Sequence, residues 1–250
     1  MLRLLSRTIV WLSREHFVDA ADVRGLLALL LADGSLVLYP SPCGGYVQLT
    51  LTAGLLEAPY LEEKVAEFRQ FIPTKAQIIP YKSAERANGR RSDVLRFRVS
   101  TTKLRPVYNM LYPGHVRRIT RNVLEVCGAR AAAWLWAEGV RHLSKNRIEL
   151  ARVGATEAEA HLIGGWLQVL SGATCTMATT IHKRPRLLFT PEQTEKITQA
   201  LLPYAPKSRA HLFAVEPQLP NVSTIRSART ELLLGEGAPL LEGPSQDTVA

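Results

Sequence analysis

The sequence predicts an α+β fold made of two copies of one arrangement, αββαββα. In each half of the chain, hydrophobic periodicity switches between helical and strand spacing in the same order. The first helix of each half ends in the same way, on an acidic residue followed by glycine, at Asp33-Gly34 and again at Glu138-Gly139. A turn at Tyr112-Pro113-Gly114 separates the halves. Such a repeat predicts a monomer with internal pseudo-twofold symmetry and two antiparallel sheets side by side.

The first half opens with a helix for which Asp22 is the candidate N-cap, and Asp33-Gly34 ends it. In the second strand of this half, Val47, Leu49 and Leu51 alternate and form a candidate core-facing set. After the first helix, this half is expected to contain strand, strand, helix, strand, strand and a short closing helix, at Ser35–Tyr39, Tyr46–Thr52, Glu57–Phe71, Gln77–Lys82, Val94–Thr101 and Lys103–Leu111.

The second half repeats this order. Thr156, with Glu159 three residues later, has the spacing of a capping box. Three tryptophans, Trp134, Trp136 and Trp166, are expected in the core rather than as platforms for bases. The expected elements run from about Val123 to Ala137, then Val140–Leu143, Arg147–Val153, Thr156 to Leu170, Thr174–Ile181, Arg186–Phe189, and Pro191 to about Tyr204.

We therefore divide the chain into two repeats, 21–112 and 122–213, joined by a linker at 113–121. Residues 1–20 carry arginines, hydroxyl residues and leucines, which is typical of an organellar transit peptide, although an ordinary surface helix fits equally well. Residues 214–250 are rich in proline, glycine, serine and acids, and are expected to be a disordered or partner-held tail.

Composition and net charge limit the classes of binding partner and of function that the sequence allows. The chain has 31 Lys and Arg against 22 Asp and Glu, a formal charge of +9, which favours nucleic acid or an anionic membrane surface. No apolar run approaches the roughly 20 residues of a membrane span. The 3 cysteines and 6 histidines lack zinc-ligand spacing. We find no glycine-rich phosphate loop and no nucleophile motif of a metabolic enzyme.

The residues Leu26–Leu36, reading LLALLLADGSL, resemble the signature of the LAGLIDADG homing endonucleases and maturases. Ala131–Gly139 is a weaker version of the same pattern, with tryptophans where the family has small or acidic residues. The linker, the segment Ser144–Leu150 and Leu201–Tyr204 also resemble the single-chain, intron-encoded type. The resemblance implies that both repeats are LAGLIDADG repeats and that their sheets form a saddle.

The resemblance also implies a site. Asp33 and Glu138 would be the catalytic residues and the ligands of Mg²⁺, which suits hard oxygen donors and supports phosphodiester cleavage. The alternative for both is a solvated acid that merely ends a helix. The sheets would lie in the major groove with alternate side chains facing the bases. The candidate nucleic-acid-binding residues are Gln48, Thr50, Lys82, Arg96, Arg98, Lys145, Arg147, Arg152, Lys183, Arg184 and Arg186.

Two functions fit the sequence. The first is a site-specific, Mg²⁺-dependent homing endonuclease acting on double-stranded DNA, or a direct descendant of one. The alternative is a catalytically inactive derivative that binds structured RNA, either an intron-splicing maturase or a structural component of an organellar ribosome or ribonucleoprotein. The altered second motif, the transit-like N-terminus and the long tail favour the alternative, whereas the retained acidic pair favours the first. The transit-like N-terminus also predicts an organellar, mitochondrial location.

Overall fold

The computed structural model describes residues 19–40, 45–82, 93–143, 147–151, 153–180 and 184–214. The chain divides into one unit from Met1 to Ala214 and another from Val215 to Ala250, and all the structure below belongs to the first. The expected transit-like segment before residue 19 and the expected tail after residue 214 lie outside the described residues. Among the helices that are described, none is long and apolar enough to cross a membrane.

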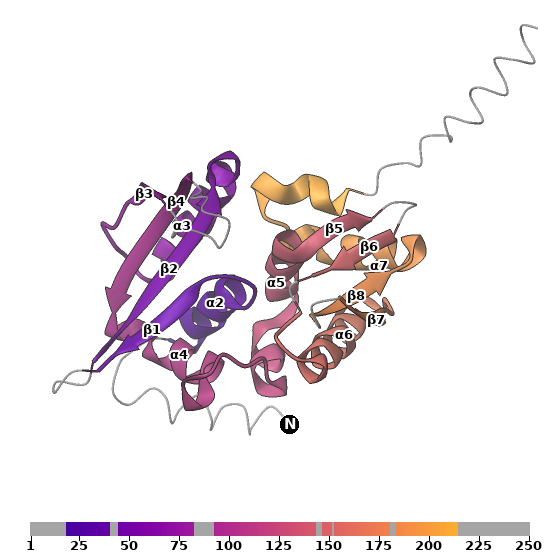
Figure 1. Cartoon of the computed structure of the whole chain (residues 1–250), viewed down its shortest axis with the longest axis horizontal. Helices are drawn as coiled ribbons and strands as arrows, with labels where there is room; N and C mark the ends of the chain where they lie inside the picture. Colours follow the sequence, from indigo (N-terminus) through magenta and orange to yellow (C-terminus); the bar gives the residue numbers. More distant parts are fainter. Residues whose placement is uncertain are drawn as a thin grey trace, which may run out of the picture. The chain divides into compact units, whose positions relative to one another are not determined.

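The predicted order αββαββα occurs twice, which confirms the fold class (Figure 1). The first copy consists of α2 (Ala20–Leu30), β1 (Ser35–Tyr39), β2 (Tyr46–Gly54), α3 (Ala58–Phe71), β3 (Ile78–Lys82), β4 (Asp93–Thr101) and α4 (Arg105–Leu111). The second consists of α5 (Arg121–Gly139), β5 (Val140–Leu143), β6 (Arg147–Leu150), α6 (Glu157–Ser171), β7 (Thr176–Thr179), β8 (Pro185–Phe189) and α7 (Pro191–Leu201). Short 3₁₀ turns include η1 (Leu55–Glu57), η4 (Leu202–Tyr204) and η5 (Lys207–Phe213).

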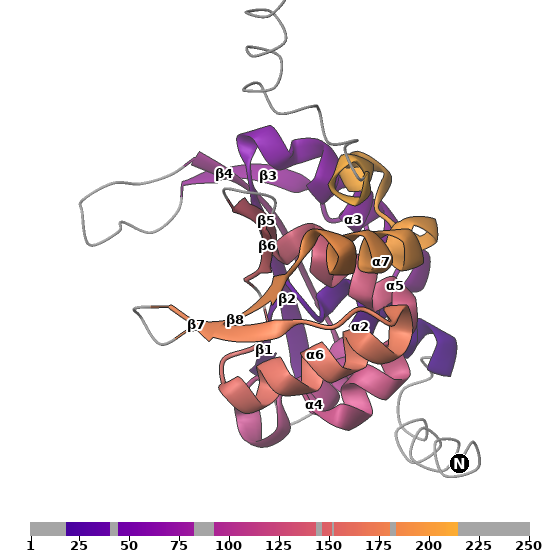
Figure 2. The same ribbon diagram turned by 90° about the vertical axis from the view of Figure 1, so that its right-hand side faces the viewer.

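Each copy forms one four-stranded antiparallel sheet. The strand orders are β1-β2-β4-β3 and β5-β6-β8-β7, so the two sheets have the same topology. Helices α3 and α4 cover one face of the first sheet, and α6 and α7 cover one face of the second (Figure 2). The apolar set Val47, Leu49 and Leu51 faces the covered side, as expected, because these side chains are at most 1% exposed. Among the described residues, no helix packs against the other face of the first sheet.

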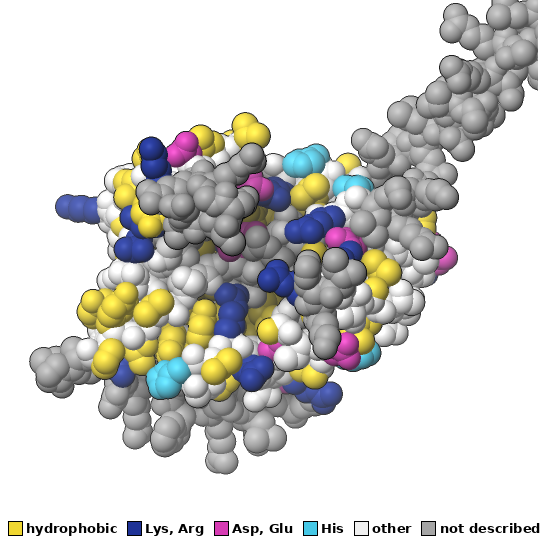
Figure 3. Space-filling view, viewed as in Figure 1, with side chains coloured by type: hydrophobic (Ala, Val, Ile, Leu, Met, Phe, Trp, Pro, Cys, Tyr) yellow, Lys and Arg dark blue, Asp and Glu magenta, His cyan; other side chains and the backbone are white. Residues whose placement is uncertain are grey.

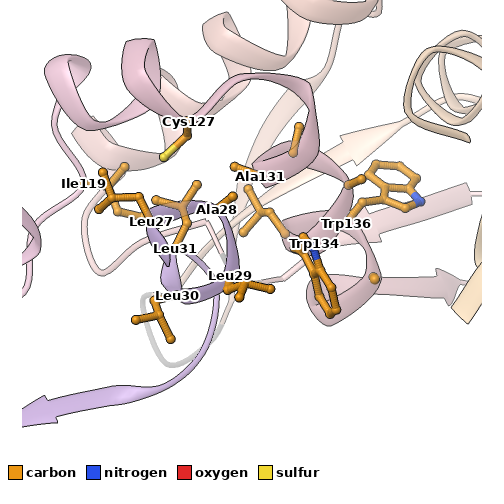
Figure 4. Packing of buried hydrophobic residues seen from close by; sticks show 14 of the residues in the cluster. Leu27, Ala28, Leu29, Leu30, Leu31, Ile119, Cys127, Ala131, Trp134 and Trp136 are labelled. Atoms are coloured by element: carbon orange, nitrogen blue, oxygen red, sulfur yellow. The ribbon is translucent and has the colours of Figure 1, made fainter. Parts of the chain in front are cut away.

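The two copies meet where α2 packs against α5. Every residue of α2 from Gly25 to Leu30 is buried, as is every residue of α5 from Ala131 to Ala137. Small side chains such as Ala28 and Ala131 let the helices approach each other, while leucines fill the space beside them (Figure 4). Burial of each leucine side chain contributes about 1.5–3 kcal/mol, so this helix pair is a major source of stability.

The tryptophans of α5 leave this packing intact. The Trp136 ring points away from α2 and meets Phe189 edge to face, with 5.4 Å between ring centroids (Figure 4). Its indole N–H donates to the Leu212 carbonyl at 3.3 Å. The Trp134 ring contacts Tyr60 of α3, with 5.5 Å between centroids. Both rings are at most 2% exposed and Trp166 packs partly buried against the same core, so the expectation that the three are core residues is confirmed.

The helix starts were only partly predicted. Helix α2 begins earlier than expected, and Asp19 caps it by accepting from the Ala21 N–H at 3.3 Å, so the prediction of Asp22 as N-cap was wrong. Asp22 lies in the first turn instead, where its negative charge suits the positive end of the helix dipole. The predicted capping box at Thr156 and Glu159 is present.

Glu159 also holds the linker between the halves. Its carboxylate accepts from the Ile119 N–H at 2.9 Å and the Ala155 N–H at 2.7 Å, besides its bonds to Thr156. Burial acts to raise the pKa of this carboxyl, but these donors outweigh burial and hold the pKa below its ordinary value. The group therefore stays ionised at neutral pH and fixes the linker to the start of α6.

Arg117, in the linker, closes the C-terminal end of α2. Its guanidinium donates to the carbonyls of Gly34 at 2.6 Å, Leu30 at 2.7 Å and Leu31 at 2.9 Å. The last carbonyls of a helix lack partners within the helix, and a cation there also suits the helix dipole. This one side chain therefore fixes the point at which the chain leaves α2 and enters β1.

We expect Arg117→Met to lower the free energy of unfolding by about 2 kcal/mol, because partly buried carbonyls lose a charged donor. Chemical denaturation followed by circular dichroism measures the loss. Arg118→Met, a change at the neighbouring exposed position, serves as the control and should have little effect. Equal stability of the two variants would show that Arg117 does not hold the end of α2.

Candidate nucleic-acid interface and acidic pair

The acidic pair lies where the two central helices end. Asp33 follows α2 and Glu138 occupies the last turn of α5, with side chains 24% and 8% exposed. Gly34 turns the chain from Asp33 into β1 with φ +92, and a Cβ atom there would lie 2.9 Å from the Leu51 side chain. Glycine is thus required at this position by both conformation and space. The structure brings together the two acids that the sequence singled out.

A buried lysine lies between these acids. Lys64 of α3 is 1% exposed, and its Nζ atom is 2.7 Å from Glu138 Oε1 and 3.3 Å from Asp33 Oδ2. The same nitrogen lies 5.7 Å from the ring centroids of Tyr60 and Trp134. One ammonium group therefore bridges a carboxylate from each half of the molecule.

Lys64 reaches this position because it falls on the core-facing side of α3. The other buried residues of that helix are Tyr60, Leu61, Val65 and Phe68, which surround Lys64 at helical spacing. A lysine in the middle of an apolar helix face has to meet an anion, because an unpaired buried charge is strongly unfavourable. That pattern is a signal in the sequence, and our sequence analysis missed it.

Tyr60 adds a second donor to the site. Its hydroxyl donates to Glu138 Oε1 at 2.7 Å. Burial, followed by the negative charge of Glu138, raises the pKa of this phenol far above its ordinary value, so it stays protonated and remains a donor. The guanidinium of Arg209, in η5, lies 4.3 Å from the Tyr60 ring centroid and donates to the Ala137 carbonyl at 2.9 Å. Arg209 also pairs with Glu57 at the start of α3.

The acidic pair does not fit a divalent cation in this arrangement. Mg²⁺ needs carboxylate oxygens at about 2.0–2.1 Å, and a metal bridging Asp33 and Glu138 would occupy the position of the Lys64 ammonium. Two cations cannot share that space, and their charges repel each other. The described residues also contain no group of three or more His, Cys, Asp or Glu side chains that could hold a metal ion.

The open face of the first sheet carries several predicted nucleic-acid-binding residues. Thr50 of β2 lies opposite Arg98 of β4, and Gln48 lies opposite Ser100 and donates to it at 3.1 Å. Arg98 is exposed, and the guanidinium of Arg96 lies 3.6 Å from the Tyr81 ring centroid. The structure thus groups Gln48, Thr50, Arg96 and Arg98 on one face, with Lys82 exposed at the end of β3.

Tyrosines on this face were not anticipated. Tyr39 of β1 and Tyr46 of β2 are each 40% exposed and stack on each other with 5.1 Å between centroids. Val37 and Tyr81 add further exposed apolar surface. In Figure 3, hydrophobic and basic side chains lie next to one another over the first sheet. Alternation alone does not distinguish such exposed tyrosines from core residues.

The second sheet is described less completely. Lys145, Arg152, Lys183 and the side chain of Arg147 lie outside the described residues. Arg184 is exposed, whereas Arg186 is partly buried and paired with Glu149, which also lies 3.9 Å from Arg141. The charge of Arg186 is therefore partly neutralised within the sheet, unlike that of Arg98.

Comparison with solved structures supports the fold. The homing endonuclease I-WcaI bound to its DNA recognition sequence is similar to this chain with a TM-score of 0.62 and 13% identity, over 79% of this chain and 87% of that one. I-DmoI in complex with DNA and Mn gives a TM-score of 0.48 and 16% identity, over 73% and 98%. No protein-family model and no curated protein matches the sequence. At 13% identity, the match to I-WcaI shows a shared fold alone.

We expect Lys64→Met to lower the free energy of unfolding by about 3 kcal/mol, because it leaves two partly buried carboxylates without their bridging cation. Adding Glu138→Gln should restore about 1 kcal/mol or more of the unfolding free energy, since only the Asp33 carboxylate then lacks the cation. A double-mutant cycle from denaturant unfolding measures this coupling. Lys196→Met, which breaks an exposed pair with Glu192 on α7, is the control and should have little effect. Additive effects of the Lys64 and Glu138 substitutions would rule out the bridge.

Proposed function

We propose that this protein binds double-stranded DNA through the open faces of its two sheets and does not cleave it. The observation that carries this proposal is the first sheet, where Arg96, Arg98, Thr50 and Gln48 share one uncovered face. The fold is similar to that of I-WcaI, a homing endonuclease bound to its DNA recognition sequence, and this similarity supports DNA as the ligand here.

The chemistry of this face suits a duplex. Arginine pairs with guanine or with phosphate through two parallel hydrogen bonds, and glutamine can pair in the same way with adenine. Alternate residues on β2 and β4 present these groups in register, since Thr50 lies opposite Arg98 and Thr52 opposite Arg96. The formal charge of +9 adds the long-range attraction to a polyanion that brings the two together.

Binding without cleavage follows from the acidic pair. A divalent cation held by two carboxylates would supply an activated water and would stabilise the leaving oxygen. The residues of this chain instead place the ammonium of Lys64 between Asp33 and Glu138, and Tyr60 donates to the same Glu138 oxygen. These contacts hold the carboxylates as a structural joint between the halves. The geometry therefore favours binding without cleavage over the Mg²⁺-dependent endonuclease.

The RNA-binding function considered in the sequence analysis, and with it a role in an organellar ribonucleoprotein, stays a prediction. Its support is the stacked pair Tyr39 and Tyr46, because exposed aromatic rings stack well on unpaired bases. Preferential binding of structured RNA over duplex DNA would replace the present proposal with that one. The organellar location also stays a prediction, since the N-terminal segment lies outside the described residues.

We expect Arg96→Ala with Arg98→Ala to weaken duplex binding and to reduce the slope of log K against log salt concentration by about 1 for each arginine that contacts phosphate. Fluorescence anisotropy over a series of salt concentrations measures both quantities. Lys196→Ala removes one charge from α7, which covers the other face of the second sheet, and is the control. An unchanged salt slope in the double variant would place the contact surface elsewhere.

We also expect the wild-type protein to cut no member of a randomised duplex library in Mg²⁺ or Mn²⁺, because Lys64 occupies the place of the metal. Sequencing of ends after incubation detects rare cleavage. The Glu138→Gln variant serves as the control for contaminating nucleases, which would cut equally in both samples. Cleavage by the wild type that disappears in Glu138→Gln would establish the endonuclease instead.

A further inference from the structure

The acidic pair carries more negative charge than its one lysine neutralises. The role inferred for that lysine is separate from DNA binding and rests on the non-cleaving part of the proposed function. Two carboxylates, Asp33 and Glu138, face one ammonium group within 3.3 Å. We propose that Lys64 is a tethered substitute for a divalent cation, and that the two carboxylates are a latent metal site which this single side chain keeps closed.

The position of the ammonium supports mutual exclusion. An oxygen–metal distance is about 2.0–2.6 Å for Mg²⁺ or Ca²⁺, so a cation bridging the two carboxylates would lie within van der Waals contact of Nζ. The charge of the lysine would repel it as well. Glu138 Oε1 and Asp33 Oδ2 accept hydrogen bonds from Lys64 Nζ at 2.7 and 3.3 Å. These two oxygens therefore bind either the ammonium or the metal.

The surroundings hold the lysine in place. Lys64 is 1% exposed and most of its buried neighbours on α3 are apolar, so an ammonium there without the acids would be strongly unfavourable. The rings of Tyr60 and Trp134 lie within 5.7 Å of it and favour a cation. A metal ion in solution must therefore compete with a cation whose local concentration is set by the fold.

The substitution Lys64→Met tests this directly, because methionine fills similar space without charge. We expect the variant to bind Mn²⁺ with a dissociation constant on the order of 10⁻⁴–10⁻³ M, as for sites with few carboxylates, and at least tenfold more tightly than the wild type. Electron paramagnetic resonance of free Mn²⁺, with protein alone and no nucleic acid, measures the binding. The midpoint of thermal unfolding of the variant should rise with Mn²⁺ concentration, whereas that of the wild type should not.

Two controls make the result specific. Adding Glu138→Gln to Lys64→Met should abolish the gained binding, and Lys196→Met should gain none. Equal Mn²⁺ binding by the wild type and Lys64→Met would overturn the proposal. If Lys64→Met does not fold, Mn²⁺ binding by the wild type is the test. Saturable binding that is lost in Glu138→Gln would show that the lysine leaves room for a metal and would overturn the proposal. Because no nucleic acid is present, failure of DNA binding leaves this test unaffected.

Discussion

The packing of α2 against α5 is the constraint on which the rest of the structure depends. These helices belong to different halves, and their small and apolar residues form the interface between the halves. Because each helix ends on an acid, close packing forces two carboxylates into one partly buried site. Like charges brought together in this way require a compensating cation. Lys64 of α3 supplies that cation. The packing of α2 against α5 therefore depends on a charged residue of a third helix.

The sequence predicted the fold well because the fold follows from local patterns. Strand alternation placed Val47 and Leu49 in the core, and the capping box at Thr156 marked the start of α6. The resemblance of both helix ends to the LAGLIDADG signature also singled out Asp33 and Glu138 as a pair. Lys64 was missed, since one lysine in an amphipathic helix does not show which acid it meets across 31 or 74 positions of sequence. The cap at Asp19 was missed because Asp22, a residue of the same capping type, lies closer in sequence to the apolar run of α2.

The two sheets have the same topology but unlike open faces. On the first, Arg98 is exposed, and Tyr39 and Tyr46 stack on each other elsewhere on the same face, so this face carries both charge and aromatic surface. On the second, Arg186 is tied to the buried Glu149. The two copies therefore share one backbone arrangement, while the described side chains on their open faces differ in chemistry. A target recognised by such a molecule would not need to be a palindrome, since the two halves present different groups.

The last described segment has a consequence for the way the protein forms. Residues 207–209 cross back to the first half, where the Glu63 carboxylate accepts from the Lys207 and Ser208 backbone N–H groups at 2.7 and 2.9 Å. These bonds span 144 and 145 positions of sequence, and Arg209 reaches Tyr60 and the end of α5 from the same segment. Contacts of such separation form late and slow folding. On the ribosome, residues 207–209 are made last in the described chain, so their contacts with Glu63, Tyr60 and the end of α5 form only after nearly all of that chain has been synthesised.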